Sequence, residues 1–168
     1  MLRSEIEQAL NAQLAAEIYS AYLYFSMAAY FEHKALKGFA GWMEAQAIEE
    51  LAHARKFYAF LNGRGGRVRL AAVDAPPANW ESPKAAFEAA LKHEQYITSR
   101  INELAALAEQ HNDRATMIFL QWFISEQVEE EASTSEVAAK LNLVQDLPNG
   151  LFMIDRELAQ RKPVLPQA

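Results

Sequence analysis

Glu50 and His53 form a Glu-x-x-His pair in the middle of a segment whose other residues have the pattern of an amphipathic helix. Three residues of an α-helix turn through about 300°, so the two side chains project from the same face. The rest of this face continues the spacing of four and three residues and is mostly apolar: Phe39, Met43, Gln46, Phe57 and Phe60. A carboxylate buried there costs several kcal/mol of folding free energy unless a partner neutralises it. The rest of the chain must therefore position a neutralising partner.

Five helical segments are predicted from the apolar spacing and from the glycine and proline residues that interrupt it. Ser4 and Glu7 have the pattern of a capping box for the first helix. Ser82 with Pro83 opens the third helix, and Asp113 caps the fourth. No repeat or change of composition divides the chain, so residues 1–168 are predicted to form a single domain. The predicted helices cover about residues 5–33, 38–62, 83–111, 114–141 and 149–160.

The lengths of the connections predict the topology. Short links join the first helix to the second and the third to the fourth, so each pair is antiparallel. The link between the second and third helices has about 19 residues at up to ~3.3 Å each, enough to follow a helix of about 27 residues at ~1.5 Å each. The second and third helices can therefore be parallel. This predicts an all-α, up-down-down-up four-helix bundle with one long crossover and a short fifth helix at the C-terminus.

A polar layer is predicted near the midpoints of the four long helices. Each helix has an apolar face with a spacing of four and three residues, and polar side chains interrupt each face near its middle. Midpoints share one level in a bundle, whichever way its helices run. The residues that should converge at this level are Glu17, Glu50, His53, Glu94, Gln127 and Glu130.

The charges in this layer predict a metal site. Its four carboxylates carry four negative charges and a metal-bound imidazole is neutral, so two divalent cations would balance the layer. Hard oxygen ligands with a single nitrogen suit iron or manganese. Glu50 has the position of a bridging ligand. Three further carboxylates beside the layer could hold a third, looser cation: Glu49, Glu126 and Glu129.

Each of these features has a simpler interpretation when it occurs alone. A single Glu-x-x-His pair ordinarily lies on a solvated face, and so does a run such as Glu129-Glu130-Glu131. Tyr24 and Trp122 are placed to donate electrons if the metals meet an oxidant, although such residues are more often packing residues. The agreement between four independent helices is what favours a dinuclear site. The other histidines are predicted to lie at the surface: His33, His93 and His111.

The composition excludes several other classes of site. The 168 residues include no cysteine, which excludes disulfides, zinc–thiolate sites and iron–sulfur clusters. The net charge is −6 and no cluster of Lys and Arg is present, so we expect no nucleic-acid partner. No apolar run reaches the ~18 residues that span a membrane, and residues 1–5 lack the pattern of a signal peptide. We therefore expect a cytoplasmic protein that does not interact with membranes.

Together these features resemble the ferritin family, specifically its haem-free bacterial and archaeal type, over about residues 1–160. The four helices, the long crossover, the short C-terminal helix and the inward Glu and His residues carry the resemblance. It implies a first iron site at Glu17, Glu50 and His53, and a second at Glu50, Glu94 and Glu130 with Gln127 close by. It also implies an accessory third iron site at Glu49, Glu126, Glu129 and Glu130, and a redox role for Tyr24.

Two departures from the bacterioferritins point away from haem. Those proteins carry a second Glu-x-x-His in the fourth helix, where this chain has Gln127-Val128-Glu129-Glu130. They also carry a haem-binding Met directly after the Glu of the first motif, where this chain has Leu51. The resemblance therefore implies two irons per subunit, a possible third, and no haem. Mini-ferritins fit less well, because they lack the fifth helix and take ligands across a subunit interface.

The resemblance implies an iron-storage protein with ferroxidase activity. Each subunit would oxidise Fe(II) with dioxygen or hydrogen peroxide, and a shell of 24 copies would store Fe(III) as an oxyhydroxide core. Two alternatives stay open: a peroxide-scavenging di-iron enzyme of smaller assembly, and an inert shell subunit without oxidase activity. The Asn112-Asp113 link could line a pore of the shell. The apolar face of the fifth helix is expected to have no room in the bundle core and to face other subunits: Leu151, Phe152, Ile154 and Leu158.

Overall fold

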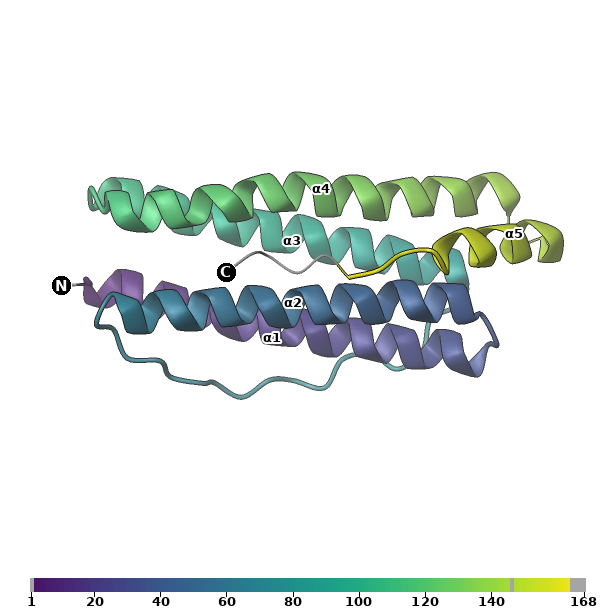
Figure 1. The fold of residues 1–168 in the computed structure, drawn as a ribbon, viewed down its shortest axis with the longest axis horizontal. Helices are drawn as coiled ribbons and strands as arrows, with labels where there is room; N and C mark the ends of the chain where they lie inside the picture. Colours follow the sequence, from purple (N-terminus) through teal and green to yellow (C-terminus); the bar gives the residue numbers. More distant parts are fainter. Residues whose placement is uncertain (1, 146, 164–168) are drawn as a thin grey trace.

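A computed structural model describes residues 2–145 and 147–163 of the chain. In this part the regular secondary structure is helical: α1 (Ser4–His33), α2 (Lys37–Gly63), α3 (Pro83–Gln110), α4 (Arg114–Val144) and α5 (Pro148–Leu158). The four long helices lie side by side, and α5 lies at one end of the bundle (Figure 1). The predicted all-α four-helix bundle with a long crossover and a short fifth helix is confirmed. α4 continues past the predicted end at residue 141, because the left-handed conformation that ends it falls at Gln145 (φ 48°).

Side-chain oxygens cap two of the long helices as predicted. Ser82 before α3 and Asp113 before α4 each accept a hydrogen bond from the amide three residues later, at 3.1 Å. The capping box predicted for α1 is wrong, because the extended residue before the helix is Arg3 and no side chain caps this end. Ser4 is instead the first residue of the helix. The acidic residues of the first turn still complement the helix dipole there.

One part of the apolar face of α5 packs into the bundle, so the expectation that this face has no room there is wrong for Ile154 and Leu158, whereas Phe152 is 63% exposed. Ile154 and Leu158 are 5% and 6% exposed and belong to the apolar core. Asp155 caps α2, because its Oδ1 accepts hydrogen bonds from the amides of Gly38 (2.7 Å) and Phe39 (3.1 Å). A glycine is needed for this approach, since a Cβ at position 38 would lie 1.7 Å from the backbone oxygen of Asp155.

The crossover between α2 and α3 follows the outside of the bundle (Figure 1). Asn11 of α1 holds its first part, donating to the carbonyl of Arg67 at 3.0 Å and accepting from the amide of Arg69 at 2.6 Å. Ser26, further along α1, donates to the carbonyl of Pro77 at 2.5 Å. These contacts satisfy backbone groups of an irregular segment, which explains how so long a connection stays ordered without helices or strands of its own.

Two apolar clusters fill the bundle, with the polar layer between them. The cluster next to α5 includes Phe31 and Phe87, and the other includes Leu10 and Phe57. Along every long helix, the buried Glu and His residues fall between members of one cluster and members of the other. The polar side chains are therefore enclosed from both ends of the bundle, which keeps them out of bulk water.

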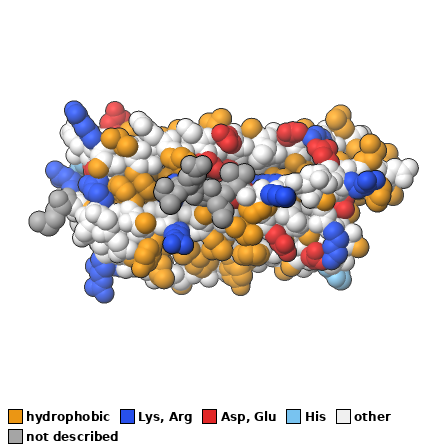
Figure 2. All heavy atoms as spheres, viewed as in Figure 1, with side chains coloured by type: hydrophobic (Ala, Val, Ile, Leu, Met, Phe, Trp, Pro, Cys, Tyr) orange, Lys and Arg blue, Asp and Glu red, His pale blue; other side chains and the backbone are white. Residues whose placement is uncertain are grey.

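No helix of the described residues is long and apolar enough to cross a membrane. On the face of the molecule shown in Figure 2, Lys and Arg side chains are interspersed with Asp and Glu side chains. This face therefore has no continuous basic surface of the kind that binds a phosphate backbone.

Candidate metal centre

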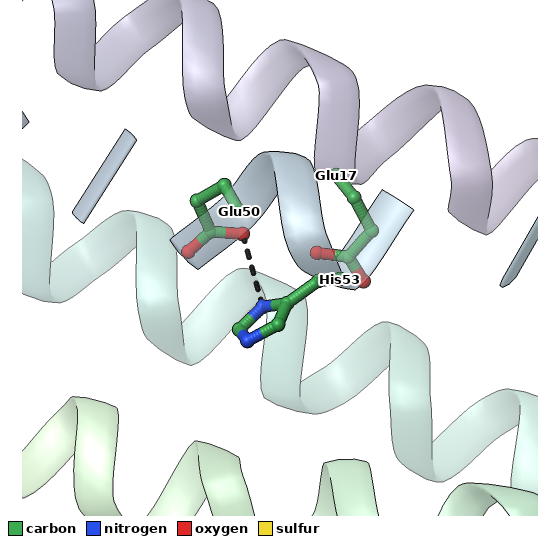
Figure 3. Close-up of side chains that lie close together, drawn as sticks. All are labelled: Glu17, Glu50 and His53. Atoms are coloured by element: carbon green, nitrogen blue, oxygen red, sulfur yellow. Dashed lines mark ion pairs between the residues drawn. The ribbon is translucent and has the colours of Figure 1, made fainter. Parts of the chain in front are cut away.

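The carboxylates and the histidine of the polar layer meet in the middle of the bundle. One ligand-type atom from each of Glu17, Glu50 and His53 lies within 4.8 Å of the other two, and the same holds for Glu50, Glu94 and Glu130. Figure 3 shows Glu17 of α1 beside Glu50 and His53 of α2, with Nδ1 of His53 3.4 Å from Oε2 of Glu50. Glu50 belongs to both groups, which is the arrangement expected of a carboxylate that bridges two metal ions.

Burial makes these carboxylates difficult to ionise. Glu17, Glu50, Glu94 and Glu130 are each at most 5% exposed. Desolvation raises the pKa of all four side chains. The charge of Glu94 raises the pKa of Glu50 further, and that of Glu50 raises the pKa of Glu17 and of Glu130. The layer therefore holds protons when no cation neutralises it, and divalent cations that bind there would displace them.

Three atoms of the layer are buried without a hydrogen-bond partner among the described residues: Oε2 of Glu17, Nε2 of His53 and Oε2 of Glu130. An unpaired buried polar atom costs about 1–3 kcal/mol and is rare in folded proteins. The two carboxylate oxygens have lone pairs that can bind a metal ion, and so does Nε2 of His53 in the tautomer that carries its proton on Nδ1. Five oxygen and nitrogen side chains without thiolate fit a pair of cations such as Fe(II).

Gln13, which is not among the predicted site residues, holds Glu17 in place. Its Nε2 donates to Oε1 of Glu17 at 2.7 Å, and its Oε1 accepts from Nε of Arg100 at 2.9 Å. Gln13 is only 1% exposed. The arginine therefore fixes the orientation of the amide, and the amide fixes one oxygen of the carboxylate so that the other stays available.

Gln46 plays the corresponding part on α2. Its Nε2 donates to Oε1 of Glu50 at 3.2 Å and to Oε1 of Glu130 at 2.9 Å, and its Oε1 accepts from Nη2 of Arg161 at 2.6 Å. Both glutamines precede their glutamate by four residues, so the helical spacing contained a signal for them. The two arginines had no such signal, because they come from α3 and from the segment after α5.

Glu94 is held by two residues that were predicted to belong to the site. The hydroxyl of Tyr24, which is fully buried, donates to Oε1 of Glu94. Burial and the charge of Glu94 raise the pKa of Tyr24, so the hydroxyl stays protonated. Nε2 of Gln127 donates to Oε2 of Glu94 at 3.2 Å and lies 3.3 Å from Oγ1 of Thr98. Gln127 therefore meets the layer as a hydrogen-bond donor to a carboxylate.

Trp122 lies on the other side of the layer. Its ring centroid is 5.3 Å from that of His53 at a steep angle, and Nζ of Lys56 lies 4.2 Å from the Trp122 centroid. Aromatic residues therefore contact both halves of the layer, Tyr24 at Glu94 and Trp122 with Phe123 at His53.

The residues predicted to form a third site line one groove, but the structure does not bring all of them together. Ligand-type atoms of Glu126, Glu130 and His53 lie within 4.8 Å of one another. Glu49 and Glu129 line the same groove, which has a volume of about 380 Å³ and lies between α2, α4 and the segment after α5. Glu49 is 5% exposed and makes an ion pair with this segment.

His93 is half-buried, so the prediction that it lies at the surface holds only in part. Its Nε2 shares a hydrogen bond with Oγ of Ser20 at 2.8 Å, and its ring centroid is 6.4 Å from that of Tyr24. Burial lowers the pKa of His93 to about 4, so the ring is neutral at pH 7. It precedes Glu94 and faces α1, and it is partly covered because α1 packs against this side of α3.

Comparison with known proteins gives a consistent set of relatives. Residues 7–144 match the family profile of the ferritin-like domain. The chain is 37% identical over 161 residues to a bacterial non-haem ferritin of Bacteroides fragilis, covering 96% of this chain and 100% of that protein. It is 40% identical over 161 residues to one of Staphylococcus saprophyticus, covering 96% of each. A solved open-pore ferritin of the archaeon Archaeoglobus fulgidus superimposes with a TM-score of 0.95 at 50% identity, over 96% of this chain and 100% of that one.

Proposed function

The chain belongs to the ferritin family, and we propose that it stores iron and oxidises it at the dinuclear centre inside each subunit. The observation that carries this proposal is the pair of ligand groups that share Glu50 within a closed polar layer. In this function Fe(II) is the substrate of a ferroxidase, and Fe(III) is stored as an oxyhydroxide core inside a hollow shell of 24 copies. Relatives described as bacterial non-haem ferritins support this assignment.

Two Fe(II) ions bind as substrates in the proposed reaction. One is held by Glu17, Glu50 and His53, and the other by Glu50, Glu94 and Glu130. Binding releases the protons that the raised pKa values keep on the carboxyl groups, because the metal ions take over the neutralising role. The protonated layer has little negative charge. Cations therefore bind more tightly at a pH at which the carboxyl groups can lose these protons.

The oxidation step needs two electrons, and the two irons supply one each. With dioxygen, two Fe(II) and two protons yield two Fe(III) and hydrogen peroxide. With hydrogen peroxide, two Fe(II) and two protons yield two Fe(III) and two water molecules. The protein acts as a template that holds both irons within reach of one oxidant molecule. Tyr24 and Trp122 lie against the layer and are placed to supply the second electron when only one of the two sites holds Fe(II).

Exposed apolar side chains support the assembly of subunits. The outer faces of α1 and α2 carry several that are 38–51% exposed: Tyr22, Phe25, Ile48, Leu51 and Tyr58. Phe152 and Met153 of α5 are 63% and 71% exposed. Large apolar side chains gathered on the outer face of a helix are typical of contact surfaces between proteins, here between copies of the chain. The Asn112-Asp113 link remains the predicted pore lining of the assembled shell.

Aerobic addition of two Fe(II) per subunit tests the activity. We expect a fast oxidation phase, followed by elution of the iron with a large particle on size-exclusion chromatography. Glu50→Ala should slow the fast phase by more than the 10–100-fold, roughly, that residues orienting a ligand contribute. Glu44→Ala, a change at an exposed position of the same helix, should leave the rate unaltered. Oxidation no faster than in buffer would refute the enzymatic proposal, and an unaltered rate in Glu50→Ala would place the centre elsewhere.

The same measurements separate the alternatives. Twenty-four copies of the 18.9 kDa chain have a mass of about 450 kDa, so a dimer on the column would favour a small peroxide-scavenging enzyme over a storage shell. Comparison of oxidation by dioxygen with oxidation by hydrogen peroxide identifies the oxidant. An inert shell subunit would assemble without a fast phase, which the complete set of carboxylates in the layer argues against.

A further inference from the structure

Arg161 binds to one face of α2 through an aromatic, an amide and a carboxylate side chain. The segment after α5 turns back between α2 and α4 (Figure 1), and Arg161 in this segment lines the groove beside the dinuclear centre. Its Cζ lies 4.0 Å from the ring centroid of Trp42, and its Nη2 donates to Oε1 of Gln46 at 2.6 Å and to Oε2 of Glu49 at 2.5 Å. Trp42, Gln46 and Glu49 are spaced four and three residues apart, so a single helix face provides all three contacts.

The ion pair between Arg161 and Glu49 is largely buried. The two side chains are 20% and 7% exposed, and Nη1 of Arg161 is buried without a hydrogen-bond partner among the described residues. Lys140, in the same groove, is 33% exposed and pairs with the more exposed Glu136 and Glu157. A charge-assisted hydrogen bond in a buried place is stronger than an exposed ion pair. Arg161 is therefore the cation of this groove that is held most firmly.

The position of Arg161 conflicts with a metal ion bound to Glu49. Glu49 shares the groove with Glu126, Glu129 and Glu130, and Oε2 of Glu130 is buried without a partner. A divalent cation bound among these carboxylates would need oxygens of Glu49, one of which Arg161 already occupies. It would also meet the positive charge of the guanidinium at close range.

We propose that Arg161 is the resident cation of the accessory site, so that a third metal ion binds Glu49 only by displacing the guanidinium. This inference rests on the proposed function, because the accessory site is defined by its place beside the dinuclear centre. Arg161 thereby sets the order of filling. The two ions of the dinuclear centre bind first, and the third binds last and more weakly.

Displacement of Arg161 also reaches the dinuclear centre. Gln46 points its oxygen at Arg161 and its NH2 group at Glu50 and Glu130. When the guanidinium leaves, the amide loses the donor that fixes this orientation, and its hydrogen bonds to the two carboxylates loosen. Binding of the third ion therefore changes how firmly Glu50 and Glu130 are held at the second iron site, and the amide of Gln46 transmits this change.

Titration of the assembled full-length protein with Zn²⁺ tests the proposal. Zn²⁺ is not oxidised, so the number of bound ions and their Kd values can be measured without the reaction. We expect the parent protein to bind two Zn²⁺ per subunit tightly and a third more weakly. Arg161→Gln should tighten the third site at least about tenfold in Kd by calorimetry. Lys162→Gln removes an equal charge from the next, exposed position and should leave the third Kd unaltered. In a Glu49→Gln background, Arg161→Gln should no longer tighten the third site.

The outcomes separate the role of Arg161 from the existence of the dinuclear centre. Two tight sites with a third Kd that is equal in the parent protein and in Arg161→Gln would overturn the role of Arg161 and leave the proposed function intact. An equal gain in Lys162→Gln would also overturn it, because the effect would then be one of general charge. Failure of the parent protein to bind two Zn²⁺ would instead refute the dinuclear centre. If Arg161→Gln does not assemble, Arg161→Lys serves, since a lysine lacks the planar group that bridges Gln46 and Glu49 over Trp42; an unaltered third Kd in it would again overturn the proposal.

Discussion

Removal of one buried carboxylate should stabilise the protein when no metal is bound. Glu50 is 1% exposed, and burial together with the charge of Glu94 raises its pKa. Glu50→Gln keeps the shape of the side chain and its ability to accept the hydrogen bond from Gln46, but the amide is neutral at every pH and needs no proton. A carboxyl group that must stay protonated in the folded state costs about 1.4 kcal/mol for each pH unit between its usual pKa and the lower of its folded pKa and the working pH. For comparison, replacement of a buried ion pair by neutral groups of similar volume is neutral or stabilising by about 1–4 kcal/mol. We expect the free energy of unfolding at pH 7 to rise within this range.

The pH dependence provides a second readout with a defined sign. Because the folded-state pKa of Glu50 lies above the usual 4.5, the folded state binds more protons than the unfolded state at intermediate pH. The stability that this side chain contributes is fully present below the unfolded pKa and is lost as the pH rises through the folded pKa. The metal-free parent protein should therefore become less stable as the pH increases from about 4.5 towards 7. Glu50→Gln should show a shallower loss.

Thermal unfolding in the presence of a chelator, at one scan rate and at several pH values, measures both effects. For a chain of this size, 1 kcal/mol corresponds to about 2–4 °C in Tm, so the expected gain is about 2–16 °C. Glu44→Gln, at an exposed position of the same helix, should change the free energy by no more than about 0.5 kcal/mol. Zn²⁺ at 100 times its Kd should then stabilise the parent protein by about 2.7 kcal/mol per site and Glu50→Gln by much less.

A lower Tm for Glu50→Gln in the metal-free state would refute this reasoning. It would mean that the carboxylate is stabilised by its surroundings even without a cation. Equal pH slopes for the parent protein and the variant would show that Glu50 does not carry the excess protons of the folded state.

Three further substitutions test separate contacts. Gln13→Leu removes a hydrogen-bond donor to a ligand and should slow the fast phase of Fe(II) oxidation about 10–100-fold while two Zn²⁺ still bind; an unaltered rate would deny Gln13 a positioning role. Gly38→Ala brings a methyl group against Asp155 and should cost about 1–3 kcal/mol in thermal unfolding, with Gly63→Ala, where nothing lies within 4 Å, as the control; equal costs would contradict the close approach. Asp113→Ala removes the cap of α4 and should cost about 0.5–2 kcal/mol in urea unfolding, and no loss would show that the cap is dispensable.

The bundle and the polar layer were predictable because both depend on short-range periodicity. A spacing of four and three residues places Glu17, Glu50, Glu94 and Glu130 on the inner face of their helices, and the lengths of the links place the helix midpoints at one level. The large cost of burying an unneutralised carboxylate then points to cations. Each of these steps needs only residues that are close in sequence, together with a count of charges.

The contacts that hold these carboxylates depend instead on residues far apart in the chain. Arg100 lies 87 residues from Gln13, and Arg161 lies 115 residues from Gln46. The partial burial of His93 likewise required the packing of α1 against α3, and the burial of Ile154 required α5 to close the end of the bundle. Helical periodicity states which face of a helix is buried, but it does not state which side chain of another segment reaches that face. Only the packed chain brings a guanidinium to each glutamine, because that position depends on the path of every element between them.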